Sequence, residues 1–218
     1  MKPDVTLNGL SMSGLGWLRE SISFPTPKSQ TNTIIVPGRN SPIRYTEALG
    51  RVSYQPRSFQ ITLSMLGNRS EFNQVVSSTA NQLAGRLAEV ILSEEPELYC
   101  VGTVQLAPAY DPKIGKGTLS ISCEDGDAYR YHTEITVVTV GSGTAVLTND
   151  YMPVIPKIVV TEETSFKWRV GTDEFRKTVS AGTWTFPELE FAHGKNSIQI
   201  TTKTTAGTVT FRYREGRL

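Results

Sequence analysis

Two histidines are the side chains of this sequence most suited to acid–base or metal chemistry near neutral pH. His132 lies between Tyr131 and Thr133 in a β-favouring run, and His193 precedes Gly194 in a turn signal. Most histidine-based metal sites and nucleophile relays need more supporting ligands than this pair offers. Both histidines are therefore expected to be structural or solvated, and no metal or cofactor site is predicted.

Two clusters of carboxylates are the other candidates for catalysis. The clustered acids are Glu94, Glu95 and Glu97 around Pro96, and Glu124, Asp125 and Asp127 around Gly126. A hydrolase using Glu97 or Asp125 would need a partner acid within about 5 to 10 Å. Acids beside proline or glycine are typical of solvated turns, and we favour that interpretation. The sequence also lacks a GxSxG elbow, a phosphate-binding glycine loop and the ligand spacing of an EF-hand, so we expect no catalytic residues.

Aromatic residues are dense in the last third of the chain, where they raise the possibility of carbohydrate stacking. Trp168 and Trp184 are the two candidate carbohydrate contacts. The favoured interpretation is core packing, because a small sandwich must fill itself with large side chains. Exposure of both tryptophans on a concave face would instead favour the alternative function, a carbohydrate-binding module with a helper domain.

Composition excludes several classes of protein. The 218 residues carry 22 basic and 21 acidic side chains, a formal charge of +1, which predicts no nucleic-acid partner. No run approaches the roughly 20 apolar residues of a membrane span, and the first residues lack the pattern of a signal peptide, so we expect a soluble chain without membrane insertion. Cys100 and Cys123 could lie on neighbouring strands, but free, packed thiols are the favoured prediction.

The elements that would position these residues are mostly strands. Alternation of apolar and polar residues predicts a strand over 58–65, and three- and four-residue apolar spacing predicts a helix over 70–84. Asn68 or Ser70 can cap this helix and Gly85 can stop it. Strands are predicted again from Val90 onward, with a turn containing Pro112, Gly115 and Gly117.

The second part of the chain is predicted to be purely β. GSGTAV at 141–146 has the composition of a flexible linker, which predicts residues 1–145 and 146–218 as two domains. Short, regularly spaced strands after this point predict a small antiparallel β-sandwich, with Ile198 and Ile200 on one face. The expected fold class is therefore mainly β, with an N-terminal β-sandwich-like domain carrying one α-helix followed by a C-terminal antiparallel β-sandwich.

The order of these features resembles the distal tail protein family of siphophages. The segments that carry the resemblance are IIVPGRNSPIRYTEALGRVSYQPRSFQITLSML, one helix, EVILSEEPELYCVGTVQL and GTLSISCED. The matching positions are Pro37, Gly38, Arg39, Tyr54, Arg57, Phe59, Tyr99 and Gly102. PKIVVTE, FPELEF, HGKNSIQI and GTVTFRYREGRL look like the family's appended galectin-like or carbohydrate-module-like sandwich.

This resemblance implies a structural, non-enzymatic phage or prophage protein. It implies a homo-hexameric ring, formed by the N-terminal domain, that joins the tail tube to the baseplate or tip. The implied partners are the tail tube protein, the tape measure protein and tail tip or tail-associated lysin proteins; carbohydrate is a further candidate. The implied location is the virion tail, and the host bacterial cytoplasm during assembly. Sheet edges and turn loops are natural sites for such subunit pairing.

Overall fold

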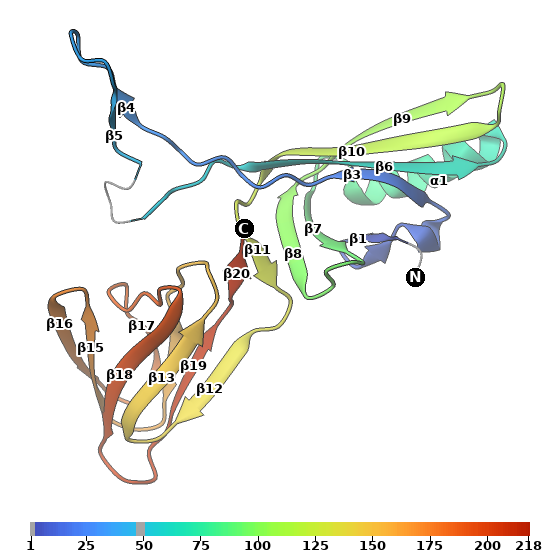
Figure 1. The fold of residues 1–218 in the computed structure, drawn as a ribbon. Coiled ribbons are helices and arrows are strands. Elements are labelled where there is room, and N and C mark those ends of the chain that lie inside the picture. The colour runs from blue at the N-terminus through green and yellow to red at the C-terminus, as the bar shows by residue number, and fades with distance from the viewer. Residues whose placement is uncertain (1–2, 47–50) are drawn as a thin grey trace. The chain divides into compact units, whose positions relative to one another are not determined.

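The computed structural model describes residues 3–46 and 51–218 and shows two compact units, Met1–Arg130 and Tyr131–Leu218. Both are built from antiparallel strands, and one α-helix lies in the first unit (Figure 1). The mainly β fold class predicted from the sequence is confirmed. Within the described residues, no helix is both long and apolar enough to cross a bilayer.

The first unit holds strands β1 to β10. Their bounds are β1 Val5–Leu7, β2 Leu10–Ser11, β3 Leu18–Ser23, β4 Thr33–Ile34, β5 Ile43–Arg44, β6 Arg57–Leu66, β7 Leu87–Leu92, β8 Leu98–Thr103, β9 Gln105–Asp111 and β10 Lys116–Gly126, with a short 3-10 helix at Ser13–Leu15. Neighbouring strands follow the orders β2-β1-β7-β8 and β3-β6-β10-β9, and β4 pairs only with β5. The core lies between the two larger groups of strands and the helix.

Strand β6 confirms the predicted alternation. Phe59, Ile61 and Leu63 are buried in the core, while Ser58 and Gln60 are exposed. β6 lies between β3 and β10 in its sheet, and its apolar residues share the core with the helix and with strands β1, β7 and β8. The two-residue period of apolar side chains therefore indicates a strand with one buried face.

Helix α1 (Arg69–Leu83) also forms where it was predicted. Asn68 accepts a hydrogen bond from the Glu71 N–H, and the Glu71 side chain accepts one from the Asn68 N–H, which together form a capping box. On the buried face, the Trp17 indole N–H donates to Thr79 Oγ1 at 3.1 Å. Past the helix end, Gly85 adopts φ +67° and its N–H donates to the Val104 carbonyl, which confirms the predicted stop.

Gly117 does not lie in the predicted turn. It lies within β10, opposite Met65 of β6, where a Cβ atom would come within 2.1 Å of the Phe72 ring. The helix packs this ring directly on the strand backbone, so the position admits no side chain. The turn itself is formed by residues 112–115, with Gly115 at φ +61°.

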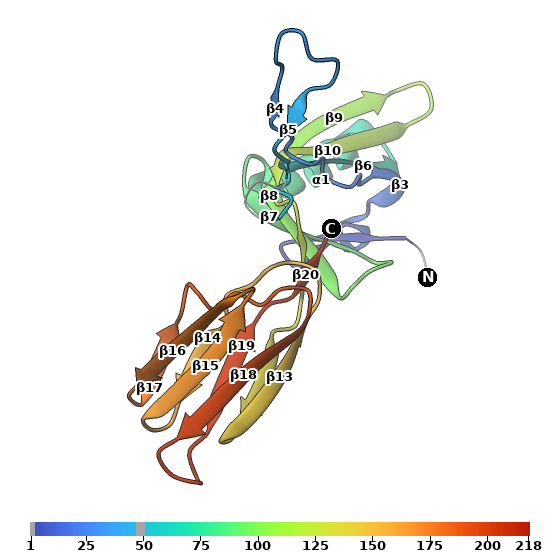
Figure 2. The ribbon, with the colours of Figure 1, turned by 60° about the vertical axis from the view of Figure 1, so that its left-hand side comes forward.

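The second unit is a sandwich of two four-stranded sheets, ordered β12-β19-β14-β17 and β13-β18-β15-β16 (Figure 2). The strand bounds are β11 Arg130–His132, β12 Thr136–Val140, β13 Gly143–Asn149, β14 Lys157–Val160, β15 Thr164–Val170, β16 Asp173–Val179, β17 Gly182–Thr185, β18 Gly194–Thr202, β19 Val209–Tyr213 and β20 Gly216–Arg217. Ile198 and Ile200 face the core, as predicted, and meet Phe211 of the other sheet's β19 there.

The predicted linker at 141–146 is part of the sandwich. β12 pairs with β19 and β13 pairs with β18, so Gly141 and Ser142 connect two strands of the second unit. The division between the units falls at Arg130 and Tyr131, earlier than the predicted 145/146 boundary. Small residues here permit a tight connection between sheets, which composition alone does not distinguish from a flexible linker.

Both cysteines are free and buried, on β8 and β10, which confirms the packed-thiol prediction. Burial raises the pKa of Cys100 to about 11 and that of Cys123 to about 12, because the thiolate would lose its hydration. The reactive thiolate is therefore scarce at neutral pH.

We expect neither thiol of the native protein to react with iodoacetamide at pH 8, and both to react after unfolding in guanidinium. Mass spectrometry of the alkylated chain measures both reactions. Rapid labelling of Cys100 or Cys123 in the native protein would contradict their placement.

We expect Gly117→Ala to lower the free energy of unfolding by about 1 to 3 kcal/mol, because the methyl group overpacks the Phe72 contact. Urea denaturation followed by tryptophan fluorescence measures the change. Gly14→Ala is the control in the same unit, since its Cβ would lie 3.4 Å from Ser11 Oγ, an ordinary contact. Equal stability of the two variants would show that the Phe72 ring does not pack directly on the backbone of β10 at Gly117.

Candidate functional site

A projecting two-stranded ribbon is the most distinctive surface feature of the first unit. We call residues 25–46 and 51–56 the arm; Glu47, Ala48, Leu49 and Gly50, which belong to the family-like segment, lie outside the described residues. Figure 1 shows β4 and β5 lying away from the sheets and helix of this unit. The arm has little core of its own, because nearly all its residues are exposed.

Backbone hydrogen bonds hold the two sides of the arm together along its length. β4 and β5 pair through Thr33 with Arg44 and Ile34 with Ile43. Nearer the base, the Gln30 N–H donates to the Ser53 carbonyl at 2.7 Å. The arm is therefore a ribbon of defined register.

The tip of the arm is apolar and built on a tight turn. The Arg39 N–H donates to the Val36 carbonyl at 3.1 Å, with Pro37 and Gly38 between them and Gly38 at φ +82°. Proline followed by a glycine of positive φ is typical of a type II turn. Ile35 is 83% exposed, so the turn presents a large aliphatic side chain to solvent.

The base of the arm is fastened by Arg57, the first residue of β6, which is only 2% exposed. Its guanidinium donates to the Pro25 carbonyl at 2.6 Å and to the Ala128 carbonyl at 2.9 Å. The same group lies 5.2 Å from the centroid of Phe24, which stacks on Phe59. Burial lowers the pKa of the Arg57 guanidinium, the expected cost of removing a cation from water.

The positions of the family-like pattern gather on the arm and its attachment. Pro37, Gly38 and Arg39 form the tip turn, while Tyr54 packs edge-on against Tyr129 with ring centroids 5.8 Å apart. On β8, a Cβ at Gly102 would lie 2.4 Å from Cys123 Sγ, so β8 and β10 approach too closely for a side chain. The remaining positions are Arg57, Phe59 and Tyr99.

The outer strands of the β3-β6-β10-β9 sheet are poor templates for edge pairing. β9 contains Pro108, which has no backbone N–H, and β3 has an irregular register between Arg19 and Ser21. Both devices discourage a further strand from joining a sheet. The arm is therefore a stronger candidate for subunit contact than the edges of this sheet.

The acidic side chains of the two sequence clusters bond to different partners. Glu94 pairs with Arg19, and Glu95 pairs with Arg130. Asp125 accepts the Thr103 N–H at 2.8 Å, and this hydrogen bond lowers the pKa of its carboxyl. In the parts of the chain that the structure describes, no three histidine, cysteine or acidic side chains are grouped to hold a metal.

The two histidines bond to one residue, Asp150. His132 Nε2 lies 3.0 Å from Asp150 Oδ2, and His193 Nδ1 lies 2.7 Å from the Asp150 carbonyl oxygen. Tyr151 stacks on the His193 ring with centroids 4.4 Å apart. The histidines therefore fix the segment that follows β13.

The two candidate tryptophans do not form an exposed pair. Trp168 of β15 is 3% exposed and stacks against Phe175 and Phe186, while its indole N–H donates to the Glu188 carbonyl at 3.1 Å. Trp184 belongs to β17 of the other sheet and is 37% exposed. The two tryptophans therefore do not form the exposed pair that the alternative carbohydrate-binding module requires.

Comparison with known proteins shows a structural likeness that extends along the whole chain. No family model matches this sequence, and no curated protein matches it either. The crystal structure of SPP1 Dit (gp 19.1) superposes with a TM-score of 0.71, at 11% identity, over 99% of each chain. The chain has the Dit fold. SPP1 Dit is described as a paradigm of the hub adsorption apparatus in phages that infect Gram-positive bacteria.

The extent of the arm was missed in the sequence, although its signals were present. Pro25 and Pro27 lie at one end of the arm and Pro56 lies at the other end. Ile34 ends β4, and Pro37 and Gly38 lie in the turn at the tip of the arm. What the sequence did not indicate is that these apolar residues stay exposed.

We expect Arg57→Gln to lower the free energy of unfolding by about 2 to 3 kcal/mol, since two partly buried carbonyls lose charge-assisted donors. Urea denaturation measures this loss, and trypsin digestion measures any loosening of the arm through cleavage at Arg39 and Arg44. Arg86→Gln removes the same charge from an exposed site and serves as the control. If the two variants are equally stable, Arg57 does not fasten the arm.

Proposed function

We propose that this protein is a structural component of a phage or prophage tail, a distal tail protein that assembles into a closed ring. Its place is between the tail tube and the baseplate or tip proteins, in the virion tail, after assembly in the bacterial cytoplasm. The proposal gives it no catalytic role. Its partners are the tail tube protein, the tape measure protein and tail tip or tail-associated lysin proteins.

The observation that carries this proposal is the arm, in a chain that shares the Dit fold over its whole length. A ribbon that leaves the unit and ends in exposed Ile34 and Ile35 has its apolar surface in water. Burial against another subunit would remove that surface, and each isoleucine contributes about 1.5 to 3 kcal/mol when fully buried. Head-to-tail contacts, in which the arm of one copy docks on the next copy, can close into a ring.

The proposed ring-forming part is the first unit, and the sandwich projects from the ring. Six copies is the expected number, from the family resemblance. A net charge of +1 places little electrostatic barrier between identical copies.

We expect the purified chain to form a closed oligomer at high concentration, and Ile35→Asp to shift it toward monomer. The tip would be buried in the proposed ring. A charge there would therefore weaken each contact between subunits by at least about 1.4 kcal/mol, which is tenfold in the association constant. Light scattering across a concentration series measures both effects. Val146→Asp, at a 58% exposed position of β13, introduces the same charge outside the arm and serves as the control.

A chain that stays monomeric at high concentration and with its tail partners would overturn the proposed ring. Retention of the oligomer by Ile35→Asp would instead show that the ring closes through a different surface. Glycan or ester hydrolysis at a useful rate by the monomer would favour the hydrolase alternative.

A further inference from the structure

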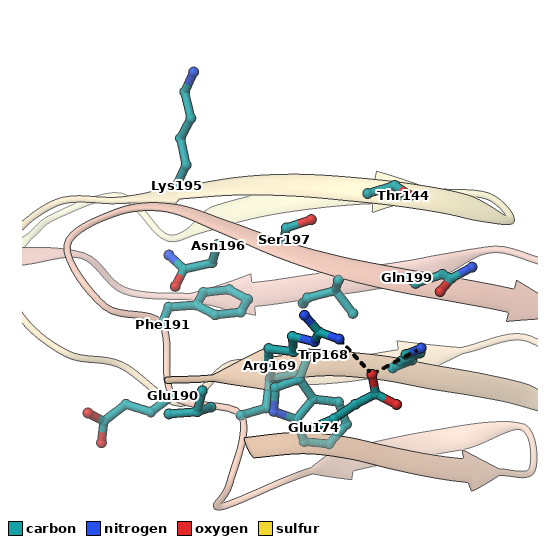
Figure 3. A pocket seen from close by; sticks show the side chains of 14 residues that line it. Thr144, Trp168, Arg169, Glu174, Glu190, Phe191, Lys195, Asn196, Ser197 and Gln199 are labelled. Atoms are coloured by element: carbon teal, nitrogen blue, oxygen red, sulfur yellow. Dashed lines mark hydrogen bonds and ion pairs between the residues drawn. The ribbon is translucent and has the colours of Figure 1, made fainter. Parts of the chain in front are cut away.

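A notch opens in the sandwich where two neighbouring strands part. β15 and β18 are in register from Thr164 with Thr202 to Trp168 with Ile198, and the register ends there. Beyond this point, Arg169 lies on one side of a depression of about 430 Å³, and Asn196 and Ser197 lie on the other (Figure 3); Val170 also lines it. The depression belongs wholly to the second unit.

The notch combines an apolar floor with a hydroxyl- and amide-rich rim. Its accessible apolar surface includes Val170, which is 47% exposed, whereas Trp168, Leu189 and Phe191 also line it but are each at most 3% exposed. Thr144 and Gln199 are cross-strand neighbours on β13 and β18, and Figure 3 shows both beside the depression. Such a surface suits a ligand with both C–H faces and hydroxyl groups.

Cations gather on the same face around one carboxylate. Glu174 lies 3.1 Å from Lys167, 3.4 Å from Arg169 and 2.9 Å from Arg176. Hydrogen bonds from Lys167 and Arg176 lower the pKa of Glu174 to about 2, so the carboxylate stays charged at neutral pH. One negative charge thus meets three positive ones, and the two arginine side chains remain 73% and 71% exposed.

A second depression shares this cationic edge. Its volume is about 410 Å³, and Lys167, Arg176 and Gln199 line it together with hydroxyl side chains. The hydroxyl residues are Ser165, Thr178 and Thr201. Lys167 and Gln199 border both depressions, so a ligand longer than one sugar unit can span them.

We propose that this face binds an anionic glycan, a saccharide chain that carries phosphate or carboxylate groups. The sugar C–H faces pack on the apolar floor, the hydroxyls bond to the short polar side chains, and the anionic groups pair with Lys167, Arg169 and Arg176. Little aromatic surface is offered for stacking, because Trp168 is 3% exposed, so charge supplies much of the affinity.

The alternative occupant, an acidic protein segment, would use the cations alone. It would leave the apolar floor and the hydroxyl rows of β13, β15, β16 and β18 without a role. The proposal goes beyond assembly of the ring, and a chain that forms no ring could still bind the glycan.

The test is calorimetric titration of the full-length protein with four probes at low and physiological salt. Tetragalacturonate and a glycerol phosphate oligomer carry the anionic groups, β-1,4-galactotetraose is the neutral sugar, and poly-glutamate carries charge without sugar. We expect measurable binding of at least one of the first two probes, weakening with salt, and affinity at least about tenfold lower for the others.

Two matched double variants locate the site. Lys167 and Arg176 are cross-strand partners on β15 and β16, and Lys157 and Arg212 are cross-strand partners on the other sheet. Replacing Lys167 and Arg176 by Gln should lower affinity for the bound anionic probe about tenfold or more. The same replacements at Lys157 and Arg212 change the net charge equally and should leave affinity within about twofold.

Glu174→Gln gives an effect of opposite sign that misfolding cannot imitate. Removing the carboxylate frees three cations, so affinity for the anionic probe should rise by about two- to tenfold. Equal or tighter binding of poly-glutamate would overturn the proposal in favour of an acidic protein partner. Absence of binding to both anionic probes, or equal effects of the two double variants, would also overturn it.

Discussion

The buried guanidinium of Arg57 is the interaction on which the arrangement of the first unit depends. It bonds to the carbonyls of Pro25 and Ala128, which lie far apart in the sequence. A cation in the interior requires fixed acceptors, because its lost hydration is otherwise uncompensated. One side chain therefore fixes where the chain leaves β3 for the arm and where it continues after β10. The arm's direction is set by a polar contact inside the unit.

Close backbone approaches supply the second constraint, and glycine is what permits them. Gly117 lets Phe72 lie on β10, and Gly102 lets β8 pass Cys123. Each position brings a helix or strand closer to its neighbour than a side chain would allow. At these two contacts the neighbouring elements are so close that their relative positions are fixed by the packing.

The sequence predicted the elements that bury a single face, because burial of one face leaves a regular spacing of apolar residues. Phe59, Ile61 and Leu63 alternate because β6 has one buried face, and α1 shows its period for the same reason. Gly117 was assigned to a turn because a glycine in a strand has the same local signal as one in a loop. The linker at 141–146 was misassigned for a similar reason: small residues suit both a flexible segment and a tight connection. Core packing was the favoured interpretation of Trp168, which is buried, whereas the grouping of cations around Glu174 depends on tertiary register, which no local pattern contains.

The arm and the notch present two different kinds of exposed surface, one apolar and one charged. At the arm tip, Ile35 is apolar and exposed, so its burial against a protein surface is favourable and largely independent of salt. At the notch, Arg169 and Arg176 are charged and well solvated, and they gain from an anionic partner only at modest ionic strength. The first kind of contact suits a permanent assembly and the second a reversible encounter. Because the two surfaces lie on different units, the proposed ring contacts and the proposed ligand contacts share no side chain.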